Sequence, residues 1–308
     1  MNDSQNATAT RDLWIRQIGT PIHYEFSPEV KFVKKYEHED FTGELYYQNN
    51  GPGTRQRVLL LFPKKPKTAG KLPAVVVPFY YPEGMVGFEL DTGKPLPYFA
   101  GIEMMLHLVR RGYAVISADA YHLTYLKSDR NWEDFQRWKD AGRALKKDHP
   151  EWTGIGKLTA DTQLLIDLLA ADPRIDAERI GIAGLSLGGK MAFYTGCLDR
   201  RIKVIVGIDF GIGWDQTNWN DIWYWGDKVQ EMKQLNLDHS SLLGCAAPKP
   251  FYLIAGHYDN QESWELMLRA PGYSKNDGRL GICNHASGHR PPAYALEKGY
   301  DFLDQWLR

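Results

Sequence analysis

The feature that most constrains the fold of this 308-residue chain is a serine between two glycines, Gly-Leu-Ser-Leu-Gly at residues 184–188. An apolar run at residues 180–183 precedes it, and a helix-like segment at residues 191–197 follows it. Strand, sharp turn and helix in this order lift a serine hydroxyl above the edge of a sheet, with the helix N-terminus directed at it. The flanking glycines fit because side chains there would collide at the tight crossing. The pattern predicts that Ser186 is a nucleophile on a strained turn.

Apolar runs and helix-like segments alternate along most of the remaining chain. The expected buried strands are residues 73–78, 113–118, 180–183, 204–208, 251–255 and 280–283, and the expected helices are residues 102–111, 159–171, 191–197 and 292–307. Such alternation is typical of βαβ units. The predicted fold class is therefore α/β, with a mostly parallel central sheet and helices on both of its faces.

The N-terminal region has a different pattern. Residues 41–47 and 57–62 have the composition of strands, and the turn-forming residues 48–53 separate them, so we expect an antiparallel hairpin. Residues 1–20 form a polar arm, with a short amphipathic helix expected around Trp14. No internal repeat or linker-like change in composition appears, so we predict a single domain over residues 1–308.

Composition excludes several classes of function. The net charge is −1, so no overall field favours nucleic acid or an anionic membrane surface. No apolar run reaches the roughly 18 residues of a membrane helix, and the polar first residues do not resemble a secretory signal. The three cysteines are widely spaced and show no metal-ligand spacing. We therefore expect a cytoplasmic protein with no metal, no nucleic-acid partner and no membrane partner.

A serine nucleophile needs a base and a group that orients the base. In sheets of this type the partners follow the serine in the order acid, then histidine. Asp259 lies just beyond the strand at residues 251–255, and His289 follows a glycine in the loop after the strand at residues 280–283. The order predicts a triad of Ser186, Asp259 and His289.

Rival residues leave alternatives open for two of these positions. Asp209 also ends a strand, one strand nearer the serine, and could be the acid in place of Asp259; Glu262 is a weaker alternative. His285 and His257 lie close to His289 along the chain, and both fit surface or supporting positions.

An ester carbonyl that becomes an oxyanion needs two backbone N–H donors. The first is predicted to be Leu187, immediately after the serine, and the second Tyr80, in the loop after the strand at residues 73–78. Its neighbour Tyr81 is expected to contact the substrate. The alternative is that both tyrosines are packing aromatics.

Two insertions interrupt the alternation, at residues 121–157 and 211–243, and both follow the C-terminal end of a predicted strand, where ligands bind in open α/β sheets. The first carries Trp132, Phe135 and Trp138 on one side of a probable helix. The second carries four of the ten tryptophans, for which we predict substrate contact: Trp214, Trp219, Trp223 and Trp225. The insertions are predicted to form a lid over the active site. The alternative is an oligomer contact, which leaves a homo-oligomer open.

The chain from about residue 72 to residue 306 resembles the α/β-hydrolase superfamily, and within it the dienelactone-hydrolase-like and acetyl-xylan-esterase-like serine esterases. The resemblance rests on Arg-Gly-Tyr-Ala-Val-Ile-Ser-Ala-Asp at residues 111–119, the serine motif through Gly189, Ala-Pro-Lys-Pro-Phe at residues 247–251 and Ser-Gly-His at residues 287–289. It implies an α/β-hydrolase fold. Three features differ from the family pattern: Pro78-Phe79 replaces the usual His-Gly, serine replaces the cysteine of dienelactone hydrolases proper, and the tryptophan-rich insertion lies outside the shared core.

The residues and the resemblance together predict a serine carboxyl-ester hydrolase that works through an acyl-enzyme without any cofactor. Its expected partner is a small-molecule ester. A carbohydrate ester is one candidate because tryptophans stack on sugar faces, but they fit an apolar lid equally well. A serine peptidase acting on short peptides and a non-catalytic binding protein of the same fold are the alternatives.

Overall fold

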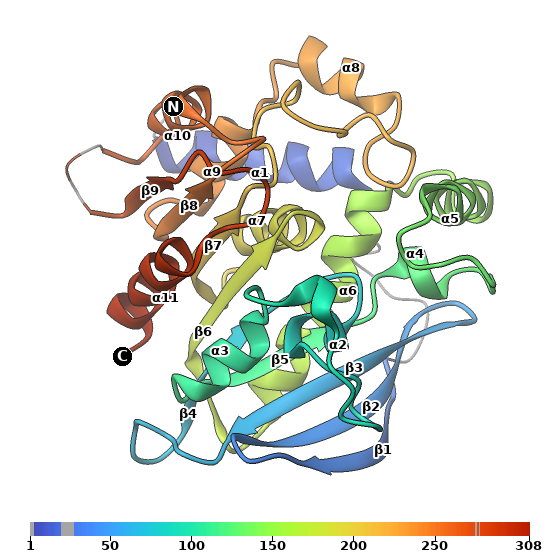
Figure 1. Cartoon of the computed structure of the whole chain (residues 1–308). Coiled ribbons are helices and arrows are strands. Elements are labelled where there is room, and N and C mark those ends of the chain that lie inside the picture. Colours follow the sequence, from blue (N-terminus) through green and yellow to red (C-terminus); the bar gives the residue numbers. More distant parts are fainter. Residues whose placement is uncertain (1–2, 20–27, 275, 277) are drawn as a thin grey trace.

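The computed structural model describes residues 3–19, 28–274, 276 and 278–308. Its centre is one sheet with the strand order β1-β2-β3-β5-β4-β6-β7-β8-β9 (Figure 1). The strands are β1 (Val30–Glu37), β2 (Phe41–Gly51), β3 (Thr54–Pro63), β4 (Leu72–Val76), β5 (Ala114–Ala118), β6 (Ile175–Leu185), β7 (Ile202–Ile208), β8 (Phe251–Ala255) and β9 (Leu280–Asn284). The helical elements are α1 (Asp3–Ile18), α2 (Pro82–Val86), η1 (Pro97–Phe99), α3 (Met104–Arg110), α4 (Tyr121–Thr124), α5 (Phe135–Asp148), α6 (Gly154–Ala171), α7 (Leu187–Leu198), α8 (Lys228–Gln234), α9 (His239–Ala246), α10 (Gln261–Leu268) and α11 (Ala293–Leu307).

The pairs β1–β2, β2–β3 and β3–β5 are antiparallel. All later pairs in the sheet order, from β5–β4 to β8–β9, are parallel. Strands β4 to β8 consist largely of buried apolar residues, as expected for strands that are covered on both faces. In register, Val76 of β4 lies beside Ile116 on one side and Ile182 on the other. The predicted α/β class, the mostly parallel sheet and the N-terminal hairpin are thus confirmed.

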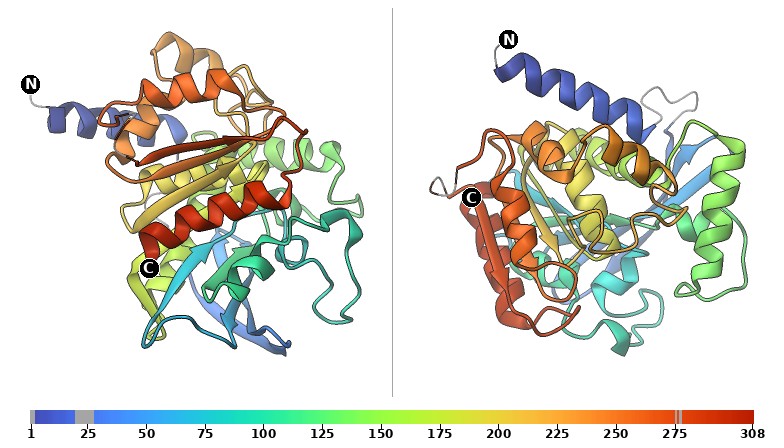
Figure 2. Two further views of the ribbon diagram at one scale, coloured as in Figure 1. Left: turned by 60° about the vertical axis from the view of Figure 1, so that its left-hand side comes forward. Right: turned by 90° about the horizontal axis from the view of Figure 1, so that it is seen from above.

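Helices cover both faces of the parallel part of the sheet, as predicted. Helices α6 and α7 pack against one face, and α3 and α11 pack against the other (Figures 1 and 2). Helix α9 lies outside α7, and α1 lies outside α9, so the N-terminal helix belongs to an outer layer. Because neighbouring strands from β5 to β9 in the sheet order are parallel, their carboxyl ends meet at one edge of the sheet. The two insertions follow β5 and β7 and so begin at this edge.

The N-terminal helix is longer than the sequence pattern predicts. It begins at Asp3, although its large apolar residues lie only in its second half. Trp14 anchors it: the indole is fully buried, and its Nε1 donates a hydrogen bond to Ser241 Oγ of α9 at 3.0 Å. Residues 1, 2 and 20 of the predicted arm lie outside the described residues. The remaining part packs onto the fold as a helix.

Candidate active site

Ser186 occupies the sharp turn between β6 and α7, as predicted. Its backbone has φ 58° and ψ −116°, a conformation that is strained for a residue with a side chain. A Cβ added at Gly184 would lie 2.0 Å from the Gly188 carbonyl oxygen, so no larger residue fits there. The Ser186 N–H donates to the Ile208 carbonyl at 2.9 Å and fixes the turn against β7. The local sequence therefore forces the serine out at the carboxyl edge of the sheet.

His289 faces Asp209. Its Nδ1 lies 2.7 Å from Asp209 Oδ2, and the aspartate side chain is completely buried at the end of β7. The other carboxylate oxygen, Oδ1, accepts hydrogen bonds from the four backbone N–H groups of residues 256–259 at 2.9–3.1 Å. Burial acts to raise the pKa of Asp209, but the hydrogen bonds from His289 and the backbone outweigh it and lower the pKa. Asp209 is thus held as a carboxylate beside the imidazole.

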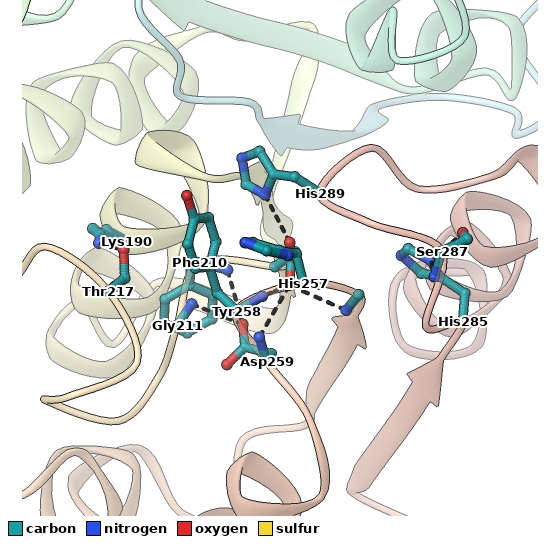
Figure 3. Close-up of polar contacts among 12 residues, drawn as sticks. Lys190, Phe210, Gly211, Thr217, His257, Tyr258, Asp259, His285, Ser287 and His289 are labelled. Atoms are coloured by element: carbon teal, nitrogen blue, oxygen red, sulfur yellow. Dashed lines mark hydrogen bonds and ion pairs between the residues drawn. The ribbon is translucent and has the colours of Figure 1, made fainter.

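Asp259 does not occupy the predicted position beside His289. It is buried, and its Oδ2 accepts from the Phe210 and Gly211 N–H groups while its Oδ1 accepts from the Ile212 N–H and the Ser263 hydroxyl. The predicted pairing is wrong because the loop after β8 turns this carboxylate back into the loop after β7 (Figure 3). The acid that contacts the imidazole is the sequence alternative, Asp209.

The side chains of His257, His285 and Glu262 are not hydrogen-bonded to Asp209 or His289, although the His257 backbone N–H donates to Asp209 Oδ1. His257 is exposed and packs its ring edge against Tyr258. His285 Nδ1 lies 2.7 Å from Ser287 Oγ (Figure 3). Glu262 is exposed in the first turn of α10. These three residues do not line the pocket described next.

Ser186, Asp209 and His289 line one pocket of about 870 Å³. Its volume lies within the range of small-molecule sites. Aromatic side chains dominate the walls, and a smaller polar group lies among them. The aromatic lining is Phe79, Tyr80, Tyr98, Trp132, Phe135, Trp138, Phe210, Trp223, Tyr224 and Tyr258, and the polar lining includes Glu133, Lys139, Lys190, Thr217, Asn218, Asp221 and Arg290.

The two predicted oxyanion donors lie in the segments named by the prediction. Leu187 is the first residue of α7, and Tyr80 lies in the buried loop between β4 and α2. Neither N–H has a hydrogen-bond acceptor among the described residues, which leaves both available to a ligand. The Tyr80 ring also packs, stacking on Trp138 at a centroid distance of 4.8 Å. Its ring is therefore a packing aromatic even though its amide is free.

Of the four tryptophans of the second insertion for which substrate contact is predicted, one lines the pocket. Trp223 lines the pocket, whereas the other three are buried behind it and donate their indole N–H groups to protein acceptors: Trp214 to Leu237 O, Trp219 to Gly211 O and Trp225 to Tyr194 Oη. They pack with Trp14 and His239 as an aromatic cluster. Tyr81 is likewise absent from the lining, because it packs against Phe99 and Trp132.

Sequence reasoning missed Lys190. It lies four residues after Ser186 on α7, one helical turn on, and it lines the same pocket. The side chain is only 2% exposed, and its Nζ lies 3.2 Å from Asn218 Oδ1 and 3.4 Å from Thr217 Oγ1. Burial lowers the pKa of Lys190 to about 7. Among the described residues no carboxylate forms an ion pair with it, so the ammonium has only neutral protein partners.

Among the described residues, one group of side chains has the spacing of a metal site: His38, Glu39 and Asp40, between β1 and β2. It does not line the pocket, and Asp40 is already paired with Arg110. Within the same described part of the chain, every helix is too short or too polar to cross a membrane.

Comparison with known proteins finds hydrolases among the proteins to which this chain is similar. Residues 59–208 match the dienelactone hydrolase family. The chain is 23% identical to the hydrolase YtaP of Bacillus subtilis over 93% of this chain and 95% of that protein. It superposes on a glucuronoyl esterase from Solibacter usitatus with a TM-score of 0.69 and 14% identity, covering 98% of this chain and 92% of the other. For an acetyl xylan esterase from Paenibacillus sp. R4 the TM-score is 0.61, the identity 18% and the coverage 98% and 93%.

Proposed function

We propose that this chain, whose residues 59–208 match the dienelactone hydrolase family, is a serine carboxyl-ester hydrolase with Ser186, His289 and Asp209 as its triad. The observation that carries the proposal is the 2.7 Å contact between His289 Nδ1 and Asp209 Oδ2 in a pocket that Ser186 also lines. A serine on a strained turn, a histidine and a buried carboxylate are the three parts that nucleophilic ester hydrolysis requires.

In the proposed reaction His289 Nε2 takes the proton of the Ser186 hydroxyl as Oγ attacks the ester carbonyl. The Leu187 and Tyr80 N–H groups donate to the oxyanion that forms. The tetrahedral intermediate collapses, the alcohol leaves with the proton from His289, and the acyl group stays on Ser186. Water, deprotonated by the same histidine, then releases the acid. Asp209 fixes the tautomer with the proton on Nδ1 and stabilises the imidazolium.

For the substrate we propose an ester of a hydroxylated compound, with a carbohydrate ester as the first candidate. Lys190, Asn218 and Asp221 offer hydrogen-bond donors and acceptors in the pocket that Trp223 and Tyr224 also line, and Lys190 Nζ lies 4.7 Å from the centroid of the Tyr224 ring. Polar groups beside aromatic walls suit a sugar ring, which has hydroxyls at its edge and an apolar face. The names of the compared glucuronoyl and acetyl xylan esterases support the same class.

The test is turnover by the purified full chain of p-nitrophenyl acetate, acetylated xylo-oligosaccharides, a methyl glucuronate ester and a chromogenic dipeptide. We expect hydrolysis of the esters, a higher kcat/KM for a sugar ester than for the aryl ester, and no activity in Ser186→Ala. Cleavage of the dipeptide with kcat/KM above that of every ester would favour a peptidase. Equal ester turnover by wild type and Ser186→Ala would remove the proposal.

A further inference from the structure

An arginine ion-pair cluster lies directly behind the loop that carries Tyr80. Arg57 of β3 donates from Nε and Nη2 to the two carboxylate oxygens of Asp119, both at 2.9 Å. Its Nη1 and Nη2 also donate to the two oxygens of Glu83, at 2.8 and 3.1 Å. One guanidinium therefore holds two carboxylates through paired hydrogen bonds. Such fork-to-fork pairs fix orientation as well as distance.

Both carboxylates belong to segments that border the Tyr80 loop. Glu83 is the second residue of α2, three residues after Tyr80. Asp119 follows β5, and the N–H of its neighbour Ala120 donates to the Tyr80 carbonyl at 2.9 Å. The Asp119 N–H donates in turn to the Arg57 carbonyl at 3.1 Å. The backbone that follows the Tyr80 N–H is thus held at two points, the Tyr80 carbonyl and the Glu83 side chain.

The same loop packs against the helix that begins after the nucleophile. A Cβ added at Gly188 would lie 2.1 Å from the Pro78 carbonyl oxygen, so the two backbones touch. Ser186 and Tyr80 line the pocket together. A shift of the loop would therefore move the Tyr80 N–H relative to Ser186. An oxyanion donor must be placed to within a fraction of an ångström to stabilise the transition state.

We propose that Arg57 is a positioning residue for catalysis: by holding Glu83 and Asp119 it keeps the Tyr80 N–H aligned with the oxyanion. The inference rests on the proposed serine hydrolase function. Arg57 does not line the pocket, so it acts through the loop and not on the substrate. The expected signature is a loss in the transition state, seen in kcat, with little change in substrate binding.

The chain contains a matched control for this cluster. Arg174 holds Glu44 and Asp172 in the same paired manner, away from the residues that line the pocket. Glu44 and Glu83 have equal side-chain exposure, 15% each. Glu83→Gln and Glu44→Gln therefore remove one negative charge from equivalent ion pairs, one beside the Tyr80 loop and one remote from it. Arg57→Lys and Arg174→Lys form a second matched pair.

The experiment measures kcat and KM for p-nitrophenyl acetate, the inhibition constant of phenylboronic acid, and the melting temperature of all four variants. Phenylboronic acid forms a tetrahedral adduct on a catalytic serine, so its affinity reports on the oxyanion donors. We expect Glu83→Gln and Arg57→Lys to lower kcat by about 10- to 100-fold, with KM within about twofold and boronate affinity reduced in parallel. Glu44→Gln and Arg174→Lys should keep wild-type kinetics.

Two results would overturn the inference while leaving the proposed function intact. One is a kcat for Glu83→Gln equal to that of Glu44→Gln. The other is a lower kcat with unchanged boronate affinity. Arg57→Lys can lose activity by unfolding, and in that case Glu83→Gln, an isosteric change, decides. If the wild-type chain showed no ester turnover that depends on Ser186, the proposed function would be wrong, and this inference would fail with it.

Discussion

Asp209 and Asp259 stabilise each other's loops: Asp209 accepts the N–H groups of residues 256–259, and Asp259 accepts those of residues 210–212. Each carboxylate thus fills a nest of backbone donors provided by the segment around the other. The two loops after β7 and β8 form one unit. Only Asp209 has an oxygen left for His289, so the two aspartates differ in role although both are buried.

This relationship predicts that the two Asp→Asn changes differ in effect. Asp209→Asn removes the partner of the imidazole and should lower kcat by about 10³- to 10⁴-fold with little change in KM, because the histidine then takes the wrong tautomer. Asp259→Asn places an amide N–H₂ against backbone donors and should cost roughly 1–3 kcal/mol of stability, with a smaller loss of kcat. Steady-state kinetics and urea unfolding of both variants test the assignment. A larger kcat loss for Asp259→Asn would restore the order first expected from the sequence.

The nucleophile and the base are tested by removal. Ser186→Ala and His289→Ala should each lower kcat by on the order of 10³-fold or more, because triad members act as a unit. His285→Ala is the control, since its ring contacts Ser287 and does not line the pocket. If His285→Ala were the less active of the two histidine variants, His289 would not be the base.

Lys190 predicts a stability that depends on pH. Burial lowers the pKa of Lys190 to about 7, whereas an unfolded lysine has a pKa of about 10.4. Between these values the folded chain binds fewer protons than the unfolded chain, so this lysine makes the free energy of unfolding rise with pH. The difference in unfolding free energy between wild type and Lys190→Met should therefore shift in favour of wild type from pH 7 to pH 10. A difference that does not depend on pH would mean that the pKa of Lys190 is the same in the folded and the unfolded chain.

The same variant tests the substrate proposal. Lys190→Met should lower kcat/KM for an acetylated sugar more than for p-nitrophenyl acetate, because the smaller substrate has no ring hydroxyls to meet the ammonium. Equal losses of kcat/KM for both esters would show that the lysine supports the structure of the pocket and does not contact the sugar hydroxyls.

Trp223 and Trp214 give contrasting predictions within one insertion. Trp223→Ala should raise KM or change ester preference, because its ring lines the pocket. Trp214→Ala should instead destabilise the fold by roughly 3–5 kcal/mol, because its indole is buried in the aromatic cluster and bonded to Leu237 O. Kinetics and thermal unfolding measure both. Size-exclusion chromatography of Trp223→Ala tests the oligomer alternative. Dissociation of an oligomer with an unchanged KM would support that alternative.

The sheet and the nucleophile could be predicted from sequence because their signals are local. Strand β8 begins and ends at the expected residues, and Gly184 is required by a contact with Gly188 only four residues away. The acid could not be chosen, because Asp209 and Asp259 both end parallel strands and only the direction of their side chains separates them. The pocket-facing tryptophan could not be chosen either, since residues 211–227 lack a regular period. The four-residue spacing from Ser186 to Lys190 was a usable signal.

The docking of α1 also bears on how the chain completes its fold during synthesis. Trp14 and Ser241 are 227 residues apart in sequence, yet they are hydrogen-bonded. The segment that forms α1 is synthesised before its binding surface on α9, which lies 227 residues later in the chain. Most of the stability of a helix in a protein comes from its tertiary packing and not from its own propensity. We therefore expect α1 to be unprotected on the nascent chain and to join the fold late, with its aromatic anchor exposed to chaperones until then.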